Sequence, residues 1–199
     1  TPRGSRKGFD FRHAYAILPS GVIRARNTFR FDNSIPDVPR LGVRMTIAPA
    51  FTNLEWLGRG PGESYADRKA GTPIGRYAGR VRDQFFPYIV PQENGNKEDV
   101  RWLALRSDDS LGIQIQAAGP MSFSASHYTP EDLTAAYHPN ELTQRDEVTL
   151  LLDYRQRGLG TASCGPDTLP KYCIPSGRQY RWEYAMIVLD GQKPGRLAL

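Results

Sequence analysis

Carboxyl side chains occur in two stretches of the sequence that are rich in glycine and proline. Glu63 and Asp67 lie between Gly60 and Arg68, and Glu93 lies in a second such stretch. Two carboxyl groups that face one glycosidic bond can serve as the acid and the nucleophile or base of a hydrolase. The alternative is that these acids pair with Arg68 or accept hydrogen bonds from loop amides, because a buried loop must satisfy its backbone. We favour the structural interpretation.

Other side chains that commonly do chemistry are scattered along the chain. His13, His127 and His138 share no motif with a nucleophilic serine or cysteine, so the sequence predicts no catalytic triad. Cys164 and Cys173 have neither a CxxC partner nor a nearby histidine, so no metal site is predicted. The sequence leaves open whether these two cysteines form a disulfide.

One glycine-rich loop is a candidate for ligand contact. It runs from Gly158 to Asp167 after a predicted strand, and its glycines permit close approach of the backbone to a ligand. The loop lacks the Gly-Lys-Ser/Thr ending and the following helix of a phosphate-binding loop. The sequence therefore does not predict a phosphate-binding loop here.

Charge and length limit the class of protein. The 199 residues include 26 Lys and Arg against 21 Asp and Glu, a net charge of +5. The basic residues are dispersed, which favours a solvated surface over a nucleic-acid site. Apolar runs such as Leu150–Leu152 are far shorter than the ~20 residues of a membrane-spanning helix, so no membrane partner is expected. With no signal peptide pattern, we expect a cytoplasmic protein, or a periplasmic or secreted one if an export signal lies upstream.

Alternating apolar and polar residues predict short strands with one buried face. The predicted strands are 23–31, 41–47, a hairpin over 101–117, 121–125, 148–154 and 180–188. Thr129 followed by Pro130 and two acids predicts one short helix. Residues 49–100 show little periodicity and are interpreted as long ordered loops. The pattern indicates an all-β, antiparallel protein with one or two short helices.

Two long motifs carry a resemblance to a known family. The stretch 53–68, NLEWLGRGPGESYADR, closely resembles a signature of the C-terminal domain of the large β-galactosidases of glycoside hydrolase family 2. The stretch 87–95, PYIVPQENG, resembles a second signature of that domain, and 158–166 resembles its late loop. The motifs occur in the family's order and spacing, and the resemblance covers roughly residues 14–190.

The resemblance implies a fold and a division of the chain. The family domain is a supersandwich of two antiparallel sheets, similar to galactose mutarotase. Residues 14–192 would be the later part of this domain, after a disordered segment 1–13 and before a tail 193–199. Seven residues fall in motifs that are structural in the family: Trp56, Glu63, Tyr65, Asp67, Arg68, Glu93 and Asn94.

The resemblance also implies a function. The family's catalytic glutamates belong to a barrel domain that matches nothing here, so no residue of this chain is expected to be catalytic and the isolated chain is expected to be inactive. The larger enzyme would hydrolyse terminal β-D-galactosides with retention and would hold magnesium and sodium outside this chain. The other domains of the same polypeptide are expected partners, and a homo-oligomer is a further expectation.

The late loop is where this domain is expected to reach the sugar. Ser163, Cys164 and Gly165 would lie at the pocket rim, and Gly165 stands where many relatives have a tryptophan that stacks on the substrate. Two alternatives to a β-galactosidase domain stay open: a non-catalytic carbohydrate-binding module and a mutarotase-like epimerase.

Overall fold

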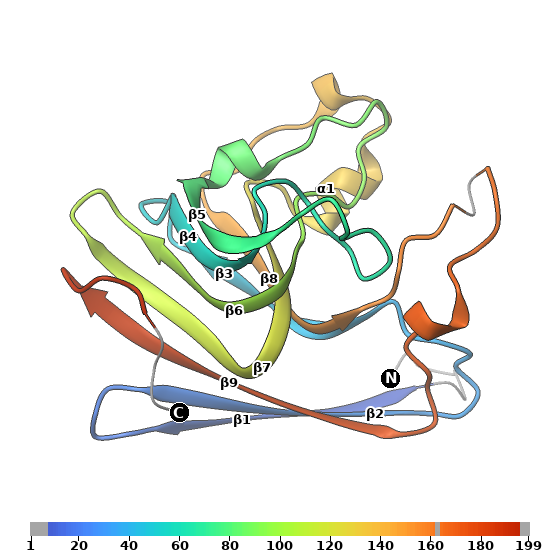
Figure 1. Cartoon of the computed structure of the whole chain (residues 1–199), viewed down its shortest axis with the longest axis horizontal. Coiled ribbons are helices and arrows are strands. Elements are labelled where there is room, and N and C mark those ends of the chain that lie inside the picture. The colour runs from blue at the N-terminus through green and yellow to red at the C-terminus, as the bar shows by residue number, and fades with distance from the viewer. Residues whose placement is uncertain (1–7, 162–163, 196–199) are drawn as a thin grey trace.

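The computed structural model describes residues 8–161 and 164–195. Within these residues, nine strands form a single antiparallel sheet whose main path has the order β1-β2-β9-β7-β6-β4-β5, while β3 pairs with β8 and β8 with β7 (Figure 1). The strands are β1 (Phe9–Ile17), β2 (Ile23–Phe31), β3 (Arg40–Ile47), β4 (Asn53–Arg59), β5 (Ile74–Arg80), β6 (Lys97–Arg106), β7 (Leu111–Ser126), β8 (Val148–Gln156) and β9 (Gln179–Asp190). The expected all-β, antiparallel class is confirmed.

The long strand β7 joins two layers of the sheet. Its residues Leu111–Ala117 pair with β9, and its residues Ser122–Ser126 pair with β8. Figure 1 shows β7 curving between β1, β2 and β9 below and the strands above them. The resemblance implies two antiparallel sheets packed face to face, and in the structure the two layers are joined into one hydrogen-bonded sheet through β7.

The main core lies between these layers and contains the apolar faces of six strands. Its buried side chains include Trp56 of β4, Phe123 of β7, Leu150 and Leu152 of β8 and Tyr184 of β9, each at most 2% exposed. Full burial of a side chain of this size contributes roughly 1.5–3 kcal/mol. The alternating patterns of β2 and β9 therefore report their buried faces directly, whereas residues 148–153 of β8 are buried on both faces.

Local hydrogen bonds close the hairpin and cap the helix that the sequence predicts. The hairpin β6–β7 closes through Ser107, whose N–H donates to the Leu111 carbonyl at 2.8 Å. The helix α1 (Pro130–Ala135) begins after Thr129, and Thr129 and Asp132 cap each other's backbone N–H groups at 3.1 and 2.8 Å. Both elements were predicted and are confirmed. The described residues also contain three 3₁₀ turns: η1 (Val81–Gln84), η2 (Pro139–Glu141) and η3 (Pro170–Tyr172).

Two sequence predictions need correction. The segment 49–100 holds strands β4 and β5 and the start of β6, which the many glycine and charged residues conceal. Residues 9–13 are not disordered, because they form the first half of β1 and pair with β2 at every position from Phe9↔Phe31 onward. The Phe11 and Phe29 rings stack across this pair with centroids 4.9 Å apart. Residues 1–7 lie outside the described residues.

The expected tail is also held to the sheet at its beginning. The Gln114 side chain of β7 accepts a hydrogen bond from the Gly195 N–H at 2.9 Å. The chain therefore runs back over the sheet after β9 ends.

Candidate functional site

Asp67 connects the loop after β4 to the glycine-rich loop after β8. Its Oδ1 accepts from the Leu159 N–H at 3.0 Å, and its Oδ2 accepts from the Gly160 N–H at 2.7 Å and the Thr168 hydroxyl at 3.1 Å. Burial alone would raise the pKa of this carboxyl, but these donors hold the pKa below its ordinary value. Asp67 is therefore ionised at neutral pH and fixes both ends of the glycine-rich loop.

The glycines of this loop are required by that contact. Gly160 has a φ of +64°, and a Cβ at Gly158 would lie 2.6 Å from the Thr168 hydroxyl and 2.8 Å from the Asp67 carboxyl carbon. A side chain at either position would push the loop away from Asp67. The sequence motif thus has a physical cause in the close packing of two loops.

Arg157 braces the loop from the side of β8. Its Nε donates to Asp37 and its Nη2 donates to Asp167, both at 2.6 Å. These two ion pairs raise the pKa of the guanidinium, with the hydrogen bond to Asp167 the larger cause. The loop is therefore anchored at Asp67 and at Arg157.

Two of the three predicted rim residues, Cys164 and Gly165, lie in the described part of this loop. Cys164 and Gly165 are exposed, and the Cys164 N–H donates to the Thr161 carbonyl at 2.9 Å. Ser163 lies outside the described residues. The φ of Gly165 is not positive, and a Cβ there would lie 2.7 Å from the Thr161 hydroxyl. Glycine at this position therefore avoids a close contact with Thr161, and the backbone here does not adopt the left-handed conformation that would require glycine.

Glu63 is the centre of a second cluster in the same loop. Its Oε2 accepts from the Gly95 N–H at 2.8 Å and the Tyr65 hydroxyl at 3.3 Å, and its Oε1 accepts from Arg68 and Tyr88. The Glu63 side chain is 13% exposed and that of Arg68 is 54% exposed. Glu63 thus ties the two signature motifs together, in keeping with a structural role.

The second motif is shaped around a tight turn. Gly95 has a φ of +75°, and a Cβ there would lie 2.7 Å from the Gln84 carbonyl oxygen. Asn94 accepts from the Phe86 N–H at 3.1 Å and donates to the Gln92 carbonyl at 2.8 Å. Asn94 and Gly95 together bring the turn within reach of Glu63.

Glu93 belongs to a partly buried chain of ion pairs that the sequence did not reveal. Arg40 donates to Glu93 at 2.9 Å and lies 3.0 Å from the fully buried Asp153. Burial raises the pKa of Asp153, and the Arg40 charge opposes this shift. A Cβ at Gly42 would lie 2.0 Å from the Asp153 carboxylate, which explains the glycine in β3. Asp153 stands at an apolar strand position, and that mismatch is the one sequence signal available.

Lys97 is a second buried charge that the sequence did not reveal. It is 2% exposed, and its ammonium lies 5.4 Å from the centroid of the Trp56 ring. Burial lowers the pKa of Lys97 to about 8, and the negative charge of Glu63 partly opposes this shift. The Trp56 Nε1 donates to the Arg59 carbonyl at 2.9 Å, which fixes the ring beneath Lys97.

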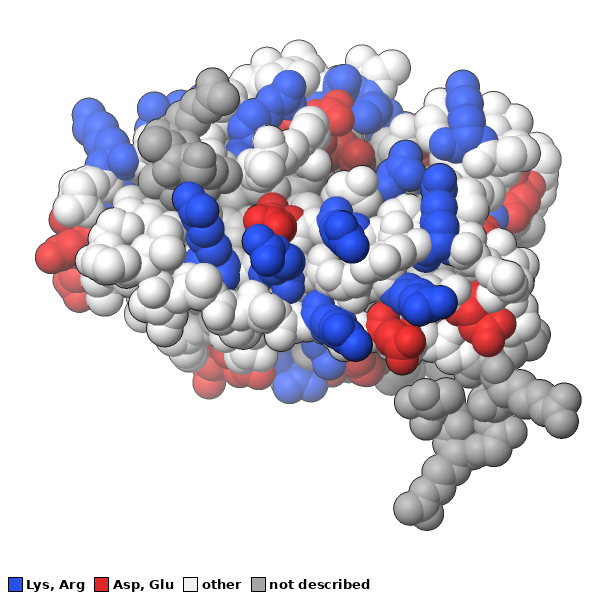
Figure 2. Space-filling view, turned by 90° about the horizontal axis from the view of Figure 1, so that it is seen from below, with Lys and Arg blue, Asp and Glu red and all other residues white. Residues whose placement is uncertain are grey.

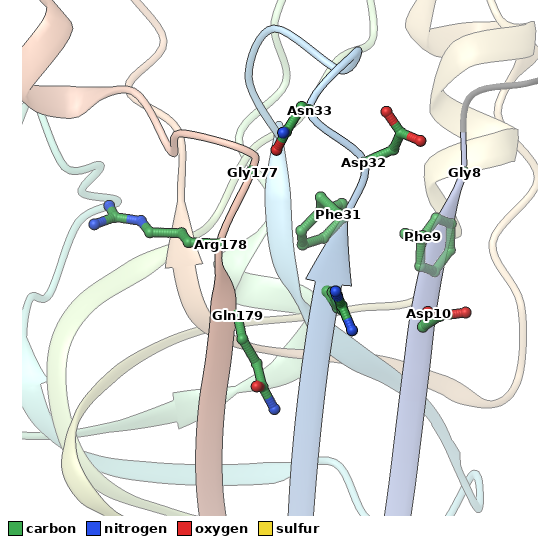
Figure 3. Close-up of a pocket in the computed structure, with 10 residues that line it drawn as sticks. Gly8, Phe9, Asp10, Phe31, Asp32, Asn33, Gly177, Arg178 and Gln179 are labelled. Atoms are coloured by element: carbon green, nitrogen blue, oxygen red, sulfur yellow. The ribbon is translucent and has the colours of Figure 1, made fainter.

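A cavity of about 330 Å³ opens beside these loops. Its walls include Lys69, Glu98 and Asp99 on one side and Tyr172 on another. Asp99 has a φ of +54° and pairs with Lys69 at 3.0 Å and Arg59 at 2.5 Å. A separate hollow of about 880 Å³ lies at the ends of β1, β2 and β9, and Figure 3 shows Phe9 and Phe31 among its lining residues.

Comparison with known proteins identifies the family. The family model described as beta galactosidase small chain matches residues 3–186. The chain belongs to the beta galactosidase small chain family. A beta-galactosidase of Priestia megaterium is 35% identical over 167 residues, which cover 83% of this chain and 16% of that protein. A beta-galactosidase of Kluyveromyces lactis is 35% identical over 179 residues, covering 89% and 17%.

This small-chain domain spans about a sixth of those relatives. A beta-galactosidase of Arthrobacter sp. is 34% identical over 141 residues, covering 68% of this chain and 14% of that protein. A solved galactose mutarotase related enzyme from Lactobacillus acidophilus aligns with 90% of this chain and 61% of its own, with a TM-score of 0.42 and 9% identity.

Across residues 8–161 and 164–195, no group of three or more His, Cys, Asp or Glu side chains is arranged to hold a metal ion. Among the helices of the same residues, none has the length and apolar character needed to cross a membrane.

Proposed function

We propose that the chain is the non-catalytic C-terminal domain of a retaining β-galactosidase that hydrolyses terminal β-D-galactosides. Its membership in the small-chain family and the names of its relatives support this proposal. The acids of the two signature motifs are engaged in structural contacts, since Glu63 and Asp67 accept backbone N–H groups and Glu93 pairs with Arg40. The catalytic glutamates, and magnesium and sodium, would belong to other domains of the polypeptide.

The role that we propose for this domain is to present the glycine-rich loop at the rim of the sugar pocket. The observation that carries it is the contact between Asp67 and the Leu159 and Gly160 N–H groups, which holds the base of the loop, while Cys164 and Gly165 are exposed. A fixed base reduces the conformational entropy that a rim loop would lose when substrate binds. Ser163, Cys164 and Gly165 are the residues proposed to line the rim.

A second part of the proposal concerns how the domain joins the rest of the polypeptide. On β1, Phe9, Phe11, Tyr15 and Ile17 share one face and are 58%, 41%, 60% and 77% exposed. An apolar row of this extent on an edge strand is typical of a protein interface. We propose that the other domains of the same polypeptide cover this face, and a second subunit is the competing occupant.

The experiment is a kinetic comparison in the full-length enzyme. Asp67→Asn retains the volume of the side chain but weakens its acceptance of the two loop amides, so we expect a raised KM for a chromogenic β-galactoside. Asp83→Asn, at an exposed position of η1, is the matched control. An unchanged KM with Asp67→Asn, at an unchanged melting temperature, would show that the loop does not line the pocket rim.

A further inference from the structure

Four arginines form a cross-shaped cluster on the outer face of the β1–β2–β9 layer, called here the arginine cross: Arg12, Arg26, Arg30 and Arg181. Thr28 of β2 pairs with Arg12 of β1 on one side and with Arg181 of β9 on the other. Arg26 and Arg30 lie two residues before and after Thr28 on β2, so their side chains emerge on the same face. Neighbouring strands are about 4.8 Å apart and alternate residues about 7 Å apart. Four arginine side chains therefore emerge from positions around Thr28.

These arginines are far apart in the sequence and are brought together only by strand pairing. Figure 2 looks onto this side of the molecule and shows basic side chains spread over it with fewer acids between them. All four arginines are exposed, whereas Asn27 and Phe29, on the opposite face of β2, are buried. The cross is thus a feature of the surface and takes no part in the core.

The positive charge of the cross is only partly neutralised. Arg26 pairs with Glu183 at 2.6 Å, and Asp10 stands opposite Arg30 in the strand register. Within the part of the chain that the structure describes, no acid forms an ion pair with Arg12, Arg30 or Arg181. Like charges on neighbouring strand positions are destabilising. A bound anion would relieve this repulsion.

The same residues line a hollow that can receive such an anion. Its volume is about 690 Å³, and it is lined by the four arginines, the neutral side chains of Thr28 and Gln179, and the two acids Asp10 and Glu183, so that basic groups outnumber acidic ones. Guanidinium groups donate in a planar fork that fits the oxygens of phosphate and sulfate, and the hydroxyl and amide add neutral donors. We propose that this hollow is a binding site for a multivalent oxyanion, namely a phosphate or sulfate group on a small molecule or a polymer.

This site is independent of the proposed β-galactosidase role, and its test needs no enzymatic activity. Titration calorimetry of the 199-residue chain with inorganic tripolyphosphate at low ionic strength should show saturable binding. Arg12→Gln with Arg181→Gln should weaken binding at least about tenfold, because two charge-assisted contacts are lost. The matched control, Arg82→Gln with Arg155→Gln, removes the same charge from two exposed positions outside the hollow and should change affinity less than about twofold.

Thr28→Val keeps the charge and the branched shape but removes the central hydroxyl, so it should also weaken binding. A heparin-derived hexasaccharide is the second probe, and its displacement by tripolyphosphate would show that both anions use this hollow. Tighter binding of the hexasaccharide would assign the group to a sulfated polymer, and tighter binding of tripolyphosphate to a phosphate-bearing small molecule. Absence of binding, equal losses in the two arginine pairs, or full affinity in Thr28→Val would overturn the proposal.

Discussion

The Asp67 carboxylate accepts a hydrogen bond from the Gly160 N–H at 2.7 Å, across a sequence separation of 93 residues. This contact joins the first signature motif to the glycine-rich loop. It gives a physical reason for the acid in one motif and the glycine in the other, because the carboxylate accepts the N–H group that the glycine brings close to it.

Asp67→Ala should destabilise the chain by about 1–3 kcal/mol, because the Leu159 and Gly160 N–H groups and the Thr168 hydroxyl lose their acceptor. Denaturant unfolding would measure the change. Asp109→Ala, in the exposed β6–β7 turn, is the control and should change stability by less than about 0.5 kcal/mol. Equal stability of the two variants would show that the loop contact contributes nothing to folding.

Arg68→Ala and Glu63→Ala should differ, although the two residues form an ion pair. Arg68 is half exposed, and Glu63 keeps Tyr65, Tyr88 and the Gly95 N–H as donors, so loss of Arg68 should cost about 1 kcal/mol or less. Loss of Glu63 removes the acceptor of all four groups and should cost about 2–4 kcal/mol. Thermal melts of both variants would check this order, and a reversed order would contradict the central place of Glu63.

Lys97 should make the chain more stable as the pH rises above 8. Burial lowers its pKa to about 8 in the folded state from 10.5. The unfolded state therefore binds more protons between these values, and stability rises with pH by about 1.4 kcal/mol per pH unit. From pH 8 to 10 the gain should be about 2 kcal/mol.

Lys97→Met removes this titration and should flatten the profile relative to the unaltered chain. Lys171→Met, at an exposed position, should leave the profile unchanged. Urea unfolding at several pH values would show the difference. Parallel profiles for the unaltered chain and Lys97→Met would mean that the ammonium is solvated in the folded state.

Gly165 tests the proposed rim in the full-length enzyme. Gly165→Trp would place an aromatic ring at the loop tip, where apolar contact with a sugar face contributes about 25 cal/mol per Å² buried. We expect a changed KM for β-galactosides with little change in melting temperature, because the residue is exposed and its φ is not positive. Gly165→Ala should show only the small cost of the contact with Thr161. Equal loss of stability in both variants with unaltered kinetics would mark a structural turn.

Strands β2 and β9 are readable from the sequence because buried and more exposed residues alternate along them, whereas much of β6, β7 and β8 is buried on both faces. Trp182 and Tyr184 alternate with Arg181 and Glu183, so β9 is evident. The edge strand β5 is hard to predict from the sequence because it has few apolar residues and these are exposed or half-buried. β1 also places apolar residues on one face, but it directly follows the basic stretch Arg3–Lys7, which favours the interpretation of this end of the sequence as disordered.

The candidate site is only half readable for a similar reason. Glu63 and Asp67 stand out because carboxylates among glycines are conspicuous in a sequence. Lys97 and Asp153 do not, because their burial depends on Trp56 and Arg40, which come from other strands. The arginine cross is invisible in the sequence, since only the register of β1, β2 and β9 assembles it.

The central claim is that this chain is a non-catalytic domain of a β-galactosidase. The most direct measurement is a side-by-side assay of the full-length gene product and the purified 199-residue chain with chromogenic β-galactoside and β-glucuronide substrates. The account predicts that the full-length protein hydrolyses the β-galactoside and that the chain alone releases no product. Turnover by the chain alone that is lost in Glu63→Gln, or a full-length protein that cleaves only the β-glucuronide, would contradict it.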